Sequence, residues 1–213
     1  MFQQHRITLM ESFQKCNLQT LDVSKNKFGM LGVELLLKTI NPATLLSLDI
    51  GSTLTSTPQS YFLLHLQNFL SQGSCSLQHL DISGCNLTPD HTDFLVRIPI
   101  AGKCLTSISL SNNPALDNSV FTRVLEVATS NNTHLERLSA EGCGICSPLD
   151  TMFLDAISDK LASENSMKFV GFTCNNLDKV DTDSLSQIWM ERWDESSQIK
   201  ITGSLVRLSV SNI

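Results

Sequence analysis

The stretch Leu77–Leu87, with the sequence LQHLDISGCNL, decides the fold. Leucine or isoleucine fills its first, fourth, sixth and last positions, and cysteine fills the ninth. Because successive side chains on a strand face opposite sides of a sheet, the alternating part L-x-L predicts a short strand with one apolar face. The ninth position follows this strand where the chain turns away. A buried side chain there can satisfy backbone groups that the bend leaves unpaired.

The same frame recurs along the chain. Its copies start at Leu18, Leu45, Leu77, Leu105, Leu135 and Met167, and a degenerate copy starts at Leu205. Successive starts up to Met167 lie 27 to 32 residues apart. The ninth positions hold Asn26, Thr53, Cys85, Asn113, Cys143 and Asn175. Six copies in register identify an array of leucine-rich repeats, a class in which the period itself is the sequence signature.

The segments between the predicted strands have the apolar spacing of helices, as in residues 120–128 and 154–161. Asp117 and the pair Ser147–Pro148 are the predicted starts of these two helices. Repeats of about 30 residues leave room for a full helix on the convex side. The predicted fold is therefore an α/β leucine-rich repeat solenoid of horseshoe shape, with a parallel concave sheet, convex helices and ribonuclease-inhibitor-like repeats.

The repeats predict a single leucine-rich repeat domain over residues 1–213. Residues 197–213 are expected to form its C-terminal cap, as a hairpin or a last strand, because a terminal repeat must cover the exposed core. The array starts abruptly at Leu18. We therefore expect the chain to be a fragment of a longer protein.

Composition excludes several functional classes. With 41% apolar residues, 17% charged residues and a formal net charge of −6, the chain has the content of a folded domain and not of a disordered tail. The acidic balance and the lack of a Lys/Arg run argue against a nucleic-acid surface. Seven cysteines, an odd count, together with no signal-peptide pattern and no apolar stretch of bilayer length, predict an intracellular protein without a membrane span.

The sequence contains none of the common catalytic or metal-binding motifs. None of the five histidines lies in a metal-binding frame, and no nucleotide-binding loop is present. Cys143 and Cys146 form a C-x-x-C pair, but Cys143 already fills the ninth position of its repeat and no second pair offers the remaining ligands. We therefore predict neither catalysis nor a metal or cofactor.

The positions between the inward leucines face solvent on the concave side of the predicted sheet. Asp22, Asp49 and Asp81 share one such position in three consecutive repeats. Neighbouring strands lie about 4.8 Å apart, so these carboxylates are expected to form a ladder of like charges. Two interpretations stay open. The ladder is an acidic docking strip for Lys or Arg of a protein partner, or it is the solvated aspartate that is common in L-D-L repeats.

The remaining concave candidates differ in chemistry. His79 lies beside the ladder, and the C-terminal half contributes Arg137, Glu141, Phe169 and Arg207. An apolar ring exposed among charged neighbours has the composition of a contact hot spot. The alternative is that Phe169 packs beneath Arg207 as local structure, since both residues hold the same position in their repeats.

In the C-terminal half, Leu110–Pro114 reads LSNNP, a helix and the repeat from Leu135 to Cys143 follow, and Gly203–Ser204 turns into the last strand. This order of motifs resembles the C-terminal leucine-rich repeat domain of Tonsoku-like proteins. The resemblance implies a scaffold of chromatin and replication forks in the nucleus, acting in homologous recombination and DNA repair. It also implies two partners, the large protein required for resistance to methyl methanesulfonate and the strand-exchange recombinase. The tetratricopeptide and ankyrin repeats of that family, including its histone H4 reader, have no counterpart in this chain, so only protein contact is carried over.

Two other classes use the same repeat type. The ligand-sensing region of an innate-immune receptor would require a nucleotide-binding domain upstream. An inhibitor-type repeat protein would suit a basic target enzyme, given a pI of about 5.3. A non-catalytic interaction scaffold is the preferred interpretation, because solenoids present long concave faces and the chain carries no catalytic set.

Overall fold

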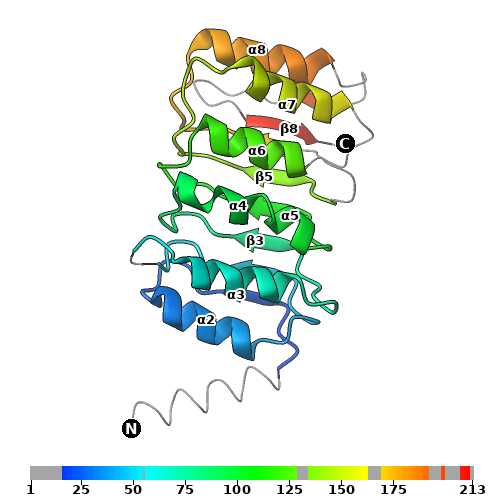
Figure 1. Ribbon diagram of the computed structural model, residues 1–213. Coiled ribbons are helices and arrows are strands. Elements are labelled where there is room, and N and C mark those ends of the chain that lie inside the picture. Colours follow the sequence, from blue (N-terminus) through cyan, green and yellow to red (C-terminus); the bar gives the residue numbers. More distant parts are fainter. Residues whose placement is uncertain are drawn as a thin grey trace.

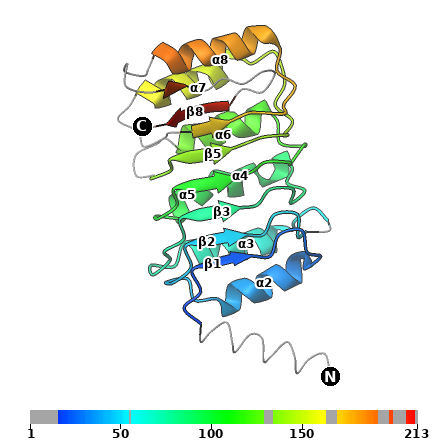
Figure 2. The same cartoon turned by 180° about the vertical axis from the view of Figure 1, so that it is seen from behind.

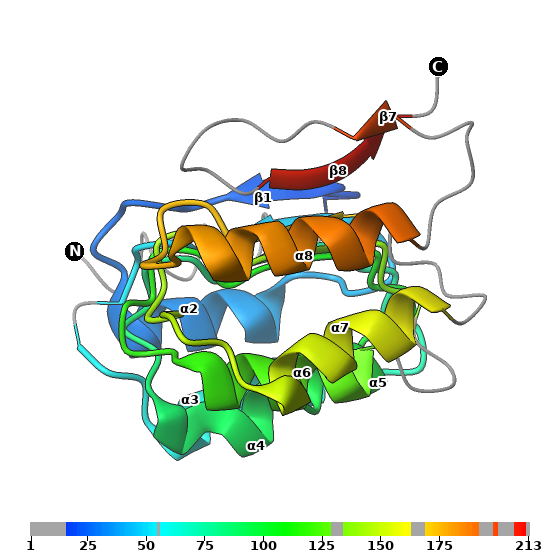
Figure 3. The same cartoon turned by 90° about the horizontal axis from the view of Figure 1, so that it is seen from above.

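The computed structural model describes residues 16–54, 56–128, 134–162, 169–191, 198–199 and 207–211. Strands and helical segments alternate along the chain, and the repeats stack along one axis (Figure 1). Seen from behind, the strands form one continuous sheet (Figure 2). The view from above places the helices together in a second layer on one face of that sheet (Figure 3). The fold is the predicted α/β leucine-rich repeat solenoid.

Six short strands form the parallel part of the sheet, in chain order. They are β1 (Thr20–Asp22), β2 (Ser47–Asp49), β3 (His79–Asp81), β4 (Ser107–Ser109), β5 (Arg137–Ser139) and β6 (Phe169–Gly171). Their central residues form one row across the sheet: Leu21, Leu48, Leu80, Ile108, Leu138 and Val170. This is the register that the repeat frame predicts.

Helical segments connect the strands. They are α2 (Gly29–Thr39), α3 (Ser60–Leu70), η1 (Pro89–His91), α4 (Thr92–Leu95), α5 (Ile98–Ala101), α6 (Asn118–Ala128), α7 (Thr151–Ala162) and α8 (Lys179–Glu191). None of these described helices has the length and apolarity needed to cross a membrane.

The predicted helices over 120–128 and 154–161 are confirmed in α6 and α7. Asp117 caps α6 as predicted, because its Oδ1 accepts a hydrogen bond from the Val120 amide at 3.2 Å. The predicted start of α7 at Ser147–Pro148 is wrong. Asp150 lies before the first residue of α7 and accepts a hydrogen bond from the Phe153 amide at 2.8 Å, so it provides the cap.

The core lies between the sheet and the helices. Leu48, Leu80, Ile108 and Leu138 in the central row are each 2% exposed or less. Full burial of a side chain of this size stabilises the fold by about 1.5–3 kcal/mol. The same row therefore marks the strand register and contributes to the stability of the core.

The ninth position of each repeat ties neighbouring repeats together. Asn113 is fully buried, and its Nδ2 donates to the carbonyl oxygens of Leu110 at 2.8 Å and of Ile82, in the preceding repeat, at 3.2 Å. Other ninth-position side chains also donate to a carbonyl of the preceding repeat: Cys85 to Ile50, Cys143 to Leu110 and Asn175 to Ala140. The predicted role of this position, hydrogen bonding to backbone groups at the bend, is confirmed.

The residue before each ninth position adopts a positive φ, because the backbone reverses there. The values are 56° at Lys25, 54° at Ser52, 60° at Gly84, 55° at Asn112, 62° at Gly142 and 59° at Cys174. Glycine adopts this region freely and asparagine at little cost, whereas other residues are strained there. The repeated turn carries the chain from the sheet toward the helical layer.

Strand direction changes at the C-terminal end of the sheet. β8 (Arg207–Ser211) pairs antiparallel with β6, and β7 (Gln198–Ile199) pairs antiparallel with β8. The register sets Arg207 opposite Gly171 and Ser209 opposite Phe169. The prediction that Arg207 shares a position with Phe169 assumed a parallel last strand and is wrong.

Candidate functional site

An open groove of about 480 Å³ runs along the concave sheet, where the strands lead into the turns. Its lining contains four carboxylates and one ammonium group: Asp22, Asp49, Asp81, Glu141 and Lys25. Serine hydroxyls supply much of the remaining lining. The groove is therefore polar, with an excess of negative charge.

Strands β1, β2 and β3 bring the three predicted aspartates side by side. The register pairs Asp22 with Asp49, and Asp49 with Asp81. In each residue Oδ1 accepts a hydrogen bond from the backbone amide two residues ahead. The donors are Ser24, Gly51 and Ser83, at 2.8, 2.8 and 2.7 Å. The carboxylates are thus oriented before a partner binds, which reduces the entropy lost on binding.

The pKa values of the aspartates differ along the ladder. Burial raises the pKa of Asp49 above its ordinary value, and the nearby charges of Asp81 and Asp22 raise it further, against the effect of its backbone hydrogen bond. The pKa of Asp22 is lowered, first by its hydrogen bonds with Ser24 and then by Lys25. Lys25 lies near Asp22, but no ion pair between described residues involves an aspartate of the ladder, so the three carboxylates outnumber the one nearby cation.

Replacing Asp49 by asparagine is expected to stabilise the free protein slightly at pH 7. Because the folded pKa is raised, the folded state binds more protons than the unfolded state between the two pKa values, and stability falls as the pH rises through that window. The amide keeps an oxygen for the Gly51 N–H but carries no charge. We expect a gain below about 1 kcal/mol at pH 7, since solvent screens this position.

Urea unfolding at pH 7 and at pH 4 measures this difference, and the gain should shrink at the lower pH as Asp49 takes up its proton. Asp155→Asn, at an exposed position of α7, is the control and should leave stability unchanged. An Asp49→Asn protein that is less stable than wild type at pH 7 would contradict a folded state that disfavours the charged form of Asp49.

A notch lies between the second and third carboxylates of the ladder. A Cβ on Gly51 would lie 3.0 Å from Oδ1 of Asp49 and 3.3 Å from Oδ1 of Asp81. Because glycine has no side chain, both oxygens stay accessible from the same side. One cationic group of a partner can therefore approach Asp49 and Asp81 together.

Serine hydroxyls continue the groove beyond β3. The Oγ atoms of Ser83 and Ser109 lie 2.7 Å apart, and Ser111 Oγ accepts a hydrogen bond from the Glu141 amide at 3.1 Å. Sequence analysis did not single out Ser109 or Ser111, although both stand in the same outward positions as the residues that it selected. The groove thus changes from a row of carboxylates to a floor of hydroxyls that can donate and accept.

Of the two interpretations of Phe169, the exposed contact residue is wrong, because the ring is buried. It is 3% exposed, with the Arg137 guanidinium carbon 4.3 Å from the ring centroid. The edge of the ring lies against Gly171, where a Cβ would be 2.9 Å from Cε1 of Phe169. A cation over an aromatic face stabilises by about 0.5–1 kcal/mol at an exposed site. Arg137 is exposed, so it presents its cation to solvent and covers the ring beneath it.

The remaining predicted residues lie apart from the ladder. His79 is exposed on β3, between Ser47 and Ser107 of the adjacent strands. The Arg207 backbone lies beside Gly171, and its side chain falls outside the described residues. The structure therefore gathers Asp22, Asp49, Asp81 and Glu141 into one groove, whose lining does not include Arg137, Phe169 or His79.

The first cysteine of the C-x-x-C pair, Cys143, has a structural role in its repeat. Burial raises the pKa of the Cys143 thiol to about 11 and that of Cys85 to about 12, so both are protonated at neutral pH. Cys143 donates to the Leu110 carbonyl as a ninth-position residue. Within the described ranges, no three His, Cys, Asp or Glu side chains are grouped to hold a metal ion.

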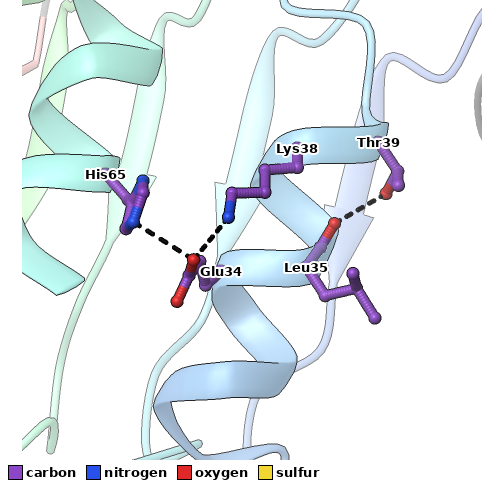
Figure 4. A network of polar contacts seen from close by, with 5 residues as sticks. All are labelled: Glu34, Leu35, Lys38, Thr39 and His65. Atoms are coloured by element: carbon purple, nitrogen blue, oxygen red, sulfur yellow. Dashed lines mark hydrogen bonds and ion pairs between the residues drawn. The ribbon is translucent and has the colours of Figure 1, made fainter.

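A polar network on the helical layer joins the first two helices (Figure 4). Glu34 of α2 accepts from Lys38, one turn further along, and lies 3.1 Å from His65 Nε2 of α3. The hydrogen bond from Lys38 lowers the pKa of Glu34. This network holds adjacent helices together and lies on the layer away from the groove.

Comparison with known proteins supports the repeat assignment. The model of the Leucine Rich repeat family matches residues 14–37 and 73–90. Tonsoku-like protein from Danio rerio is 29% identical over 211 residues, which is 99% of this chain and 14% of that protein. Tonsoku-like protein from Mus musculus is 28% identical over 202 residues, which is 93% of this chain and 14% of that protein. The resemblance to Tonsoku-like proteins is confirmed over nearly the whole chain.

A second group of relatives is matched over less of the chain. NACHT, LRR and PYD domains-containing protein 14 from Mus musculus is 28% identical over 132 residues, which is 62% of this chain and 13% of that protein. The chain therefore spans a small part of the length of each of these relatives. What the comparisons support for this chain is a leucine-rich repeat scaffold for protein interaction.

Proposed function

We propose that this leucine-rich repeat chain, similar to Tonsoku-like proteins, is a non-catalytic interaction module whose concave groove binds a basic segment of a partner protein. One observation carries the proposal: three carboxylates on adjacent strands are held in the same orientation by backbone amides. Among the described residues, none of the three forms an ion pair, and Lys25 is the one cation that lines the groove with them. Like charges on adjacent strands disfavour the free fold slightly, and a basic partner would relieve that repulsion.

The groove favours lysine or arginine side chains presented on a polar segment. Asp49 and Asp81 flank the notch above Gly51, and this arrangement fits one ammonium or guanidinium group. The serine hydroxyls farther along the groove can bind backbone or polar side-chain groups of the same segment. Charged contacts of this kind increase the association rate and select the partner more than they add affinity.

The likeness to Tonsoku-like proteins extends the proposal to a cellular role. We infer that the partner belongs to a replication-fork and recombination complex on chromatin in the nucleus. The two candidates are the partner required for methyl methanesulfonate resistance and the strand-exchange recombinase. The likeness to the NACHT-domain proteins, which covers less of the chain, supports the alternative of a sensing region in an innate-immune receptor.

Affinity capture from nuclear and cytosolic extracts, followed by mass spectrometry, tests this proposal. The test variant carries Asp22→Lys, Asp49→Lys and Asp81→Lys and is expected to lose the proteins that wild type retains. The control variant reverses three exposed aspartates outside the groove: Asp90, Asp155 and Asp183. Both variants have the same net charge, so they differ only in where the charges are reversed. The control should retain those proteins because its groove is intact.

Each outcome bears on a different part of the proposal. Fork or recombination proteins that are lost only with the groove variant would support both the site and the complex. Retention by both variants would overturn the groove as the docking site. A partner set that contains inflammasome components and no fork proteins would favour the receptor alternative.

A further inference from the structure

Exposed apolar side chains gather on the outer face of α2 and α3, which lie side by side in the helical layer (Figure 1). Leu31 of α2 is 74% exposed, and Leu64 and Tyr61 of α3 are 54% and 41% exposed. We refer to these three residues as the outer patch. Single apolar side chains are normal on a protein surface, whereas a contiguous group marks an interaction site.

Two contacts show that the residues of the outer patch lie together. The Gln59 amide, just before α3, donates to Met30 Sδ of α2 at 3.3 Å. Near the middle of both helices, Glu34 lies 3.1 Å from His65 Nε2 (Figure 4). All three residues of the outer patch fall between these two contacts along their helices. The patch therefore spans both helices at one level, close to the helix starts.

The surface around the outer patch carries more positive than negative charge. Helix α3, with the sequence SYFLLHLQNFL, contains no Asp, Glu, Lys or Arg. The acidic residue of α2, Glu34, is mostly covered and is already bonded to Lys38. Lys27 is exposed in the turn before α2, and the exposed Lys38 lies two helical turns beyond Leu31 on the same side of the helix. A cation therefore stands at each end of the patch.

The helix ends beside the outer patch add to this positive potential. The first turns of α2 and α3 contain no acidic residue, and neither N-cap side chain makes a capping hydrogen bond. A helix N-terminus carries the equivalent of about half a positive elementary charge and favours a nearby anion. Acidic side chains of a partner that covered the patch would therefore be stabilised there.

A cavity between the same two helices continues the surface toward the helix ends. It is open and has a volume of about 290 Å³. Its buried lining is apolar and comes from Leu37, Ile40 and Phe69, while Lys38 and His65 contribute polar groups. An apolar anchor surrounded by polar groups is the arrangement of a binding hot spot.

We propose that the outer face of α2 and α3 docks an amphipathic helix of a partner protein, whose apolar stripe covers the outer patch and whose flanking acidic residues face Lys27 and Lys38. The patch and the cavity follow each other over about two helical turns. An amphipathic helix presents its apolar anchors over the same distance, at positions i, i+3 or i+4, and i+7. This face lies on the layer away from the concave groove, so the inference does not depend on the proposed function.

Binding of two synthetic stapled helices, measured by fluorescence polarisation, tests the proposal. Both carry the same leucine stripe, which is flanked by glutamate in one peptide and by glutamine in the other. We expect the wild-type chain to bind the glutamate peptide about two- to thirty-fold more tightly, because two exposed cations face it. This preference would be local, since the chain as a whole has a net charge of −6.

Two pairs of variants locate the binding. Leu31→Ser with Leu64→Ser is expected to weaken binding of the glutamate peptide by about ten-fold or more. Its control, Met152→Ser with Val180→Ser, changes exposed apolar residues of α7 and α8 and should bind as wild type does.

Lys27→Glu with Lys38→Glu should remove the preference for glutamate. Its control reverses two exposed lysines elsewhere, Lys103 and Lys179, and should keep that preference.

Three results would overturn the proposal. The first is a glutamate peptide that fails to bind, or that binds the Leu31→Ser/Leu64→Ser protein as tightly as wild type. The second is a glutamine peptide that binds wild type as tightly as the glutamate peptide. The third is a dimeric mass in light scattering that the same leucine variant returns to the monomer, which would assign the outer patch to a second copy. Binding of basic peptides by the concave groove is measured separately, so failure here leaves the proposed function untouched.

Discussion

Replacing Asn113 by alanine is expected to lower the free energy of unfolding by about 3 kcal/mol. Asn113 is fully buried at the centre of the array. Its Nδ2 donates to Leu110 and Ile82, and its Oδ1 accepts from the Leu87 amide at 3.0 Å. Alanine would remove the side-chain partners of the Ile82 carbonyl and the Leu87 amide, whereas the Leu110 carbonyl would keep its weak bond from the Cys143 thiol. Each buried group that loses its partner costs about 1–3 kcal/mol, and the small void left by the side chain adds to the loss.

Urea unfolding followed by circular dichroism measures the effect as a lower midpoint. Asn26→Ala is the matched control, because Asn26 holds the same position in the first repeat and is more exposed. Its side-chain bonds to described residues go to Val23 and Ser24 of its own repeat. We expect a loss of about 1 kcal/mol there. Equal losses at Asn113 and Asn26 would mean that the bonds between repeats add little.

Structural features that recur in every repeat could be predicted from the sequence. Strand positions, their register and the ninth-position bonds all follow from side chains that recur at fixed spacing, and the aspartate ladder follows from that register. Asp22, Asp49 and Asp81 are neighbours because they share one position in successive repeats. Their use by a partner is not a property of the period and stays a prediction.

Contacts between dissimilar residues on different strands could not be predicted. Phe169 is buried because Arg137 covers its face and Gly171 leaves room at its edge, and neither relation follows from the repeat frame. The direction of β8 could not be predicted from the sequence for another reason. Alternation with a period of two reads the same in both directions, so the pattern around Arg207 fits a parallel or an antiparallel strand equally well.

The positive φ of several turns is encoded by residue type. Gly84, Asn112 and Gly142 stand immediately before ninth positions, and all three are residue types that adopt positive φ readily. Lys25 and Ser52 adopt the same φ without that preference. The surrounding hydrogen bonds therefore impose the turn on residues that do not favour it by themselves.

Neutralising the ladder is expected to weaken binding of a basic peptide by roughly three- to hundred-fold. The variant carries Asp22→Asn, Asp49→Asn and Asp81→Asn, and the probe is fluorescein-labelled deca-arginine, read by fluorescence polarisation at low salt. Each exposed ion pair contributes about 0.2–1 kcal/mol, so three pairs contribute about 0.6–3 kcal/mol, and every 1.4 kcal/mol is about ten-fold in Kd. Asparagine keeps the oxygen that accepts from the backbone, so the turns should stay intact.

Salt and a matched variant separate the groove from net charge. The difference from wild type should shrink at high salt, because the charges are screened beyond about one Debye length. The control neutralises the three exposed aspartates outside the groove, Asp90, Asp155 and Asp183. Equal weakening in both variants would assign binding to overall charge and would remove the groove as a site. Weakening in the ladder variant alone is expected, because only there are three carboxylates oriented together at the spacing of adjacent strands.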